Sequence, residues 1–159
     1  MANKMKLSPY HSALRSEFSD TELQEIQSHS IRYASGERRE AIRLAAAWEA
    51  HVDKIDRDRE LPRTDRSVWT EYDFVAALTM RDFLQDALDL LPATLRDKLT
   101  QLIEPVDDRY RGYTVPDSGT RVSAIADVDI SHRGWWWFRI PSTGPIAEDF
   151  EIMKSRGVQ

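Results

Sequence analysis

The sequence contains no cysteine, so the chain can form neither a disulfide nor a thiolate that acts as nucleophile or metal ligand. Long apolar runs are missing as well, because every apolar stretch is far shorter than the roughly 20 residues that span a bilayer. The N-terminus also lacks the continuous apolar segment of a secretory signal. We therefore expect a soluble, cytoplasmic protein that makes no membrane contact.

Glycine is scarce, and catalytic motifs are absent. The 6 glycines form neither a phosphate-cradling loop nor a dinucleotide fingerprint, and no GxSxG nucleophile motif occurs. The 4 histidines show none of the spacings that are typical of metal ligands. The sequence thus predicts a protein that is not an enzyme and that needs no cofactor and no metal.

A basic block is the third absence. The chain has 22 basic and 27 acidic residues, which gives a net charge of -5, and the arginines of its densest basic stretch, "GERRE" at 36–40, are flanked by glutamates. Nucleic-acid binding usually needs a basic surface that displaces counterions. The charge favours a basic protein partner over DNA or RNA.

The residue patterns that are present predict helices in the first two thirds of the chain. The composition, 41% apolar and 31% charged, suits one globular domain over residues 1–159, with a helical part over about 19–112. Ser19 with Glu22 and Thr70 with Asp73 have the three-residue spacing of capping boxes, so we expect helices to begin directly after Ser19 and Thr70. The first helix should end near Ala34, before Gly36.

Apolar periodicity predicts three further helices in this part. In the second helix an apolar stripe recurs at steps of four and three, and it consists of Ala41, Ala45, Trp48, Val52 and Ile55. A third helix over about 71–91 is apolar around half its circumference, which marks it as the central one. A fourth begins at Pro92, so close behind that the two should form an antiparallel hairpin.

Beyond Gly119 the pattern changes to alternation. Residues 121–131 and 135–140 read as two strands joined by the loop His132-Arg133-Gly134. In this register Trp136 faces the core, whereas Trp135 and Trp137 point outward. A short last helix should start at Pro145, within a hairpin and tail over about 120–157. The predicted fold is α+β and mainly α: an antiparallel bundle of about four helices with a C-terminal β-hairpin and a short terminal helix.

Two features are candidate partner-binding surfaces. The outward face of the hairpin would carry two tryptophans beside charged residues, a composition typical of binding hot spots; its members are Trp135, Trp137, Arg139, Asp127 and Asp129. The predicted third helix carries an acidic stripe at Asp82, Asp86 and Asp89. Either could also be structural, with the hairpin face covered by another element and the stripe merely solvated. The sequence therefore favours a non-catalytic interaction protein, for example a bacterial immunity or antitoxin protein that blocks a basic enzyme.

Two alternatives remain. Asp127, Asp129 and His132 could hold Mg²⁺ in a metal-dependent hydrolase. With Pro116-Asp117, this segment is similar to the Pro-Asp and acidic-x-Lys elements of metal-dependent nucleases, but no lysine follows Asp127-Val128-Asp129. Alternatively, Trp135 and Trp137 could stack a sugar or another small ligand.

Overall fold

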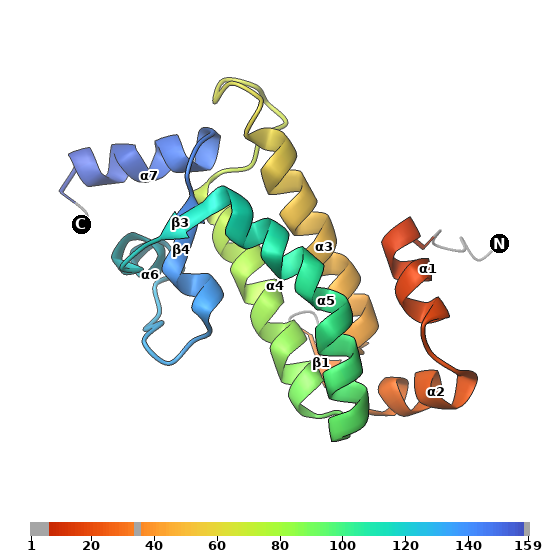
Figure 1. The fold of residues 1–159 in the computed structure, drawn as a ribbon. Helices are drawn as coiled ribbons and strands as arrows, with labels where there is room; N and C mark the ends of the chain where they lie inside the picture. The colour runs from red at the N-terminus through yellow and green to blue at the C-terminus, as the bar shows by residue number, and fades with distance from the viewer. Residues whose placement is uncertain (1–6, 34–35, 158–159) are drawn as a thin grey trace.

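Three long helices form the centre of the structure, a computed structural model that describes residues 7–33 and 36–157. They lie side by side (Figure 1) and are α3 (Ala41–Asp58), α4 (Glu71–Asp89) and α5 (Ala93–Tyr113). The helices α1 (Pro9–Ser16) and α2 (Asp20–Ser28) lie on one side of them, whereas α6 (Thr120–Ala126) and α7 (Pro145–Ser155) lie on the other. The predicted class, α+β and mainly α, is confirmed.

Both predicted capping boxes are confirmed. The Ser19 hydroxyl accepts from the Glu22 amide at 3.1 Å, and the Glu22 carboxylate accepts from the Ser19 amide at 2.9 Å. Thr70 and Asp73 repeat this exchange at the start of α4. The predicted end of the first helix is wrong, because α2 stops at Ser28 and the chain then turns into a strand; Ala34 lies outside the described residues.

The core lies where the apolar stripes predicted it. All five stripe residues of α3 are buried, and α4 buries apolar residues on more than one side. Helix α5 continues through Pro105 to Tyr113, because Val106, Tyr110 and Tyr113 extend its buried face beyond the proline. Helix α7 begins at Pro145 as predicted, and it packs against α4 through Phe150.

Two short antiparallel ribbons supply the β-structure. β1 (Ile31–Arg32) pairs with β2 (Arg38–Arg39). β3 (Thr114–Pro116) pairs with β4 (Arg139–Pro141), with Val115 opposite Ile140. The second ribbon joins the end of α5 to the start of the C-terminal segment, so that residues 117–138 form a long connection whose two ends are held together by the β3–β4 pairing.

The predicted hairpin of 121–131 and 135–140 is wrong. Most of the first segment is the short helix α6, and residues Trp135–Phe138 form a 3₁₀ helix, η1. Gly119 at φ 83° and Asp127 at φ 54° set the two ends of α6 in the left-handed region, which interrupts any extended strand there. The break in alternation at Ile125 was the helical signal, since Val122 and Ile125 are three residues apart and both pack against the core.

Candidate functional site: an acidic pocket beside the tryptophan cluster

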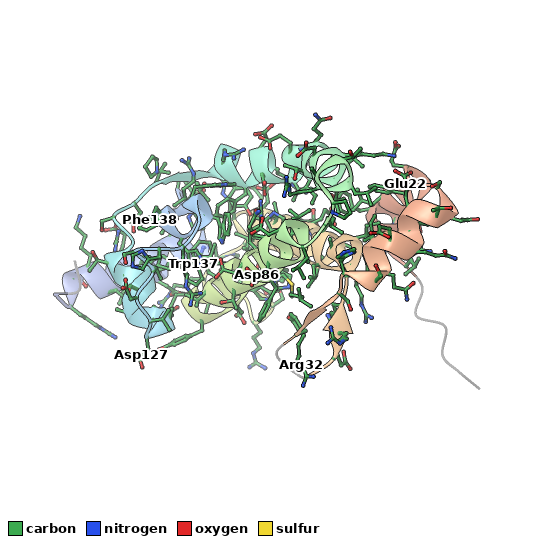
Figure 2. The ribbon with its side chains drawn as sticks, turned by 90° about the horizontal axis from the view of Figure 1, so that it is seen from below. Glu22, Arg32, Asp86, Asp127, Trp137 and Phe138 are labelled. Carbon is green, nitrogen blue, oxygen red and sulfur yellow. The ribbon has the colours of Figure 1, made fainter. Side chains whose placement is uncertain are left out.

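The three consecutive tryptophans form an inward cluster. Trp137 is fully buried at 0% exposure, Trp136 is 5% exposed, and Trp135 is half-buried. The expected burial of Trp136 is confirmed, but the prediction that Trp137 points outward is wrong. In a 3₁₀ helix successive side chains turn by about 120°, so they do not alternate between two faces as they would in a strand. Figure 2 shows Trp137 lying further inside the molecule than Asp127.

Asp82 fastens this cluster to α4. One of its carboxylate oxygens, Oδ1, accepts hydrogen bonds from the indole nitrogens of Trp136 and Trp137, both at 2.8 Å. The other oxygen accepts from the Arg133 guanidinium at 2.7 Å. A buried indole N–H needs an acceptor, and a carboxylate is a strong one. Asp82 is therefore a structural anchor and leaves little capacity for a ligand.

Behind Trp136 lies a buried ion pair. The Arg81 guanidinium donates to both carboxylate oxygens of Asp107, at 3.1 and 3.0 Å, and it also lies 4.4 Å from the ring centre of Trp136. Asp107 also accepts from the indole of Trp48 at 2.9 Å. Arg81 in turn reaches Gln85 at 3.2 Å, which places a charge network directly under the tryptophan cluster.

A pocket of about 520 Å³ opens where α4 meets the segment 132–136. Its lining combines acidic, amide and aromatic side chains with one guanidinium, that of Arg133, which is paired with Asp82; the other lining side chains include Phe83, Gln85, Asp86, His132 and Trp136. The pocket thus joins two features that were separate in the sequence, the acidic stripe and the tryptophan-rich segment.

Asp86 is the carboxylate of this pocket that has no partner within the described residues. It is exposed, and it makes no hydrogen bond or ion pair with any residue in the part of the chain that the structure describes. Partial burial raises the pKa of its carboxyl above 3.8, with further increases from Asp82 and Asp89, while Arg133 opposes them. A cation placed in the pocket would relieve this repulsion, which makes Asp86 the natural contact for a basic group.

The remaining predicted site residues are not gathered into one surface. Arg139 is half-buried and donates to Thr114 Oγ1 at 2.9 Å and to the Thr114 carbonyl at 3.0 Å, so it braces the β3–β4 ribbon. The predicted place of Arg139 beside Asp127 on one hairpin face is wrong, because Arg139 lies opposite Pro116. Asp89 is exposed and accepts from the Gln85 side chain at 2.9 Å.

Asp127 and Asp129 lie in the loop that leads from α6 to the pocket, and both are exposed. Asp127 ends α6 in a left-handed conformation. The Asp129 carboxylate accepts from the Ser131 amide at 2.9 Å, and this bond lowers the pKa of Asp129. Their predicted place on one strand face, which the metal hypothesis required, does not exist.

The structure also contradicts the geometry that a metal site at Asp127, Asp129 and His132, or a sugar stacked on Trp135 and Trp137, would require. Within 7–33 and 36–157, no group of three or more His, Cys, Asp or Glu side chains could hold a metal ion. Asp117 is instead bound by Arg121 at 3.1 Å and by the Gly119 amide at 2.8 Å. No pair of outward indoles exists for stacking a sugar, because Trp137 is buried and Trp135 is covered by the Arg111 guanidinium, 3.9 Å from its ring centre.

The comparisons with known proteins add no assignment: no family model, curated protein or solved structure matches this chain. Among the described helices, none is long and apolar enough to cross a membrane.

Sequence reasoning missed the contributions of Phe83, Gln85 and His132 to the pocket, and it missed the anchoring role of Asp82. A local signal existed for Gln85 and Asp86, which follow Asp82 by three and four residues and so share its helix face. No local signal connects that face with residues 132–136.

Proposed function

We propose that this protein is a non-catalytic interaction protein whose acidic pocket receives a basic side chain of a partner protein. The observation that carries the proposal is Asp86, an unpaired carboxylate at a pocket of about 520 Å³ that is walled by Phe83 and Trp136. Such a pocket fits an arginine, whose planar guanidinium pairs with carboxylates and lies against aromatic rings.

The protein already holds an arginine of its own in this way. Arg133 pairs with Asp82 at 2.7 Å, and its guanidinium lies 4.8 Å from the ring centre of Trp137. A partner guanidinium beside Asp86 would repeat this arrangement one helical turn further along α4. The exposed carboxylates of Asp89 and Asp129 extend the negative field around the pocket, which would speed the approach of a basic partner.

A specific form of this proposal is an immunity or antitoxin protein that covers the basic active site of a bacterial enzyme in the cytoplasm. The net charge of -5 supports it, because an acidic inhibitor associates rapidly with a basic target. Single buried arginine contacts often dominate such interfaces, so the pocket would provide specificity while the surrounding acidic residues provide speed.

The test compares capture of binding proteins by the wild-type chain with capture by Asp86→Asn, using the immobilised protein, native lysate and quantitative mass spectrometry. We expect a basic protein that is retained by the wild type and lost from the variant, and a recombinant form of it should bind Asp86→Asn at least about tenfold more weakly. Glu60→Gln is the matched control, since Glu60 is exposed and distant in sequence from the pocket residues. Equal retention by Asp86→Asn and the wild type would refute the pocket as the contact site.

A further inference from the structure

A second hollow lies at the other side of the three-helix core, among α1, α2, β2 and the first turn of α3 (Figure 1). It has a volume of about 640 Å³ and shares no lining residue with the acidic pocket. We call it the arginine groove; its polar lining includes His11, Arg15, Gln24, Arg38, Arg39 and Arg43.

The groove is positively charged although the whole chain is acidic. Four arginines line it together with only two carboxylates, those of Asp20 and Glu40. Glu40 is already occupied, because its carboxylate caps α3 by accepting from the amides of Ile42 at 2.7 Å and Arg43 at 3.0 Å. The lining residues therefore carry an excess of two positive charges at neutral pH, and Glu37, which pairs with Arg39 from outside the lining, reduces this excess to about one.

Two of these four arginines have no hydrogen-bond or ion-pair partner within the described residues. The guanidinium groups of Arg15 and Arg43 make no hydrogen bond or ion pair there, and that of Arg38 donates only to the Ser30 carbonyl, at 3.2 Å. Many of the other arginines are paired with carboxylates, as in the bridges of Arg109 to Asp53 and of Arg121 to Asp117, whereas those without a partner in the described part of the chain, such as Arg66, stand singly. A local group of unpaired guanidinium groups in an acidic protein indicates a site for an anion.

Arg39 provides a second, independent observation. Its Nε is buried and has no hydrogen-bond partner in the described part of the chain, although its Nη2 reaches Glu37 at 3.2 Å and its guanidinium lies 4.4 Å from the Tyr33 ring centre. A buried N–H donor without an acceptor is costly, and because Arg39 lines the groove, an anion bound deeply enough to reach its Nε would supply the missing acceptor.

We propose that the arginine groove binds a small organic phosphate monoester, such as a sugar phosphate. A phosphate monoester carries close to two negative charges at pH 7, which the unpaired guanidinium groups of Arg15 and Arg43 could balance, and its oxygens suit the forked donors of arginine. The volume lies within the range typical of small-molecule sites.

The rest of the lining favours a hydroxyl-bearing ligand over a nucleic acid. Gln24, Gln27 and Ser30 offer amide and hydroxyl groups for hydrogen bonds to a sugar. Among the described lining residues there is no Phe, Tyr or Trp on which a base could stack. His11 adds a further polar group, and burial lowers its pKa below 6.5, so that its ring is neutral at pH 7 and can hydrogen-bond without adding charge.

The test is calorimetric titration of the full chain with glucose 6-phosphate, inorganic phosphate and glucose at constant ionic strength in a phosphate-free buffer. We expect saturable binding of glucose 6-phosphate, weaker binding of inorganic phosphate and no binding of glucose. Arg15→Gln and Arg43→Gln should each weaken the binding of glucose 6-phosphate about tenfold or more, because each removes a charge-assisted hydrogen bond. Both side chains are exposed and neither makes a hydrogen bond or ion pair within the described residues, so both variants should unfold close to the wild-type temperature.

The matched control is Arg66→Gln, which removes one exposed positive charge from outside the groove and should leave the binding unchanged. An equal loss of affinity in Arg66→Gln would mean that the phosphate responds only to overall charge, and would overturn the site. Absence of saturable binding by the wild type in the low-millimolar range would also overturn it. Equal affinities for inorganic phosphate and glucose 6-phosphate would overturn the sugar-phosphate assignment.

Discussion

Gly134 supports the tryptophan cluster by having no side chain, and Gly134→Ala tests this directly. A Cβ at this position would lie 2.2 Å from Cη2 and 2.3 Å from Cζ3 of the Trp136 ring, far inside van der Waals contact. The backbone itself accepts alanine, since φ is -67° and ψ is 169°. The whole cost therefore comes from the contact with one indole.

The expected loss of stability can be worked out from the displacement of the Trp136 ring. To reach an ordinary contact distance the ring has to move by about 1 Å, which would break its 2.8 Å hydrogen bond to Asp82. Overpacking costs about 1–3 kcal/mol, and loss of a hydrogen bond to a charged group costs about 1.5–3 kcal/mol. We expect Gly134→Ala to lower the free energy of unfolding by about 3–5 kcal/mol, measured by urea denaturation followed by circular dichroism.

Two further variants make this test specific. Gly112→Ala is the matched control, because a Cβ at Gly112 meets nothing within 4 Å and alanine is the better helix former, so it should stabilise by up to about 1 kcal/mol. Trp136→Phe removes the clashing ring atoms, so its combination with Gly134→Ala should cost less than the sum of the two single changes. A loss below about 1 kcal/mol for Gly134→Ala, or additivity in the double variant, would refute the reasoning.

Three further predictions concern charged groups. Asp107→Asn should lower the free energy of unfolding by about 3–5 kcal/mol in urea denaturation, because it breaks a bidentate pair with Arg81 and leaves that guanidinium buried, at 5% exposure. Replacing Asp107 with Leu and Arg81 with Met together should recover most of the lost stability, and a loss below about 1 kcal/mol for Asp107→Asn would contradict the argument. Asp86→Asn should raise the free energy of unfolding at pH 7 slightly, by less than about 0.5 kcal/mol in urea denaturation, because the raised pKa of Asp86 means that folding disfavours the charged carboxylate. This difference should vanish as the pH falls below 3.8, and a clear destabilisation at pH 7 would contradict the argument. Burial lowers the pKa of His51 below 6.5, so the contribution of its neutral ring to stability is complete above pH 6.5 and is lost as the pH falls through the lowered pKa. His51→Gln should therefore reduce the fall in the free energy of unfolding between pH 7 and 5, and an unchanged fall would show that His51 does not cause it.

The parts of the fold that follow from neighbouring residues were predictable. Ser19 with Glu22 and Thr70 with Asp73 mark helix starts because each pair satisfies amide groups that no later part of the chain can reach. The stripe of α3 from Ala41 to Ile55 was equally visible, since its spacing alone decides which face is buried.

The parts that depend on distant contacts were not predictable. Small apolar residues such as Ala124 and Ala126 suit a strand or a helix, so apart from Ile125 the pattern did not distinguish the two; the left-handed positions at Gly119 and Asp127 mark the ends of the helix in the structure. The direction of Trp137 depends on an acceptor, Asp82, that lies 55 residues earlier in the chain. For the same reason Asp82 was placed in an open acidic stripe, although most of its hydrogen-bonding capacity is used inside the protein.

The long sequence separation between Asp82 and its partners has a consequence during synthesis. Arg133 follows Asp82 by 51 residues, so at ribosomal rates the carboxylate leaves the exit tunnel roughly 3–10 s before the guanidinium that will pair with it. During that interval the nascent chain carries α4 with its tryptophan-binding face uncovered. The nascent chain thus passes through a stage in which a chaperone could bind the face of α4 around Asp82, which Trp136 and Trp137 later cover.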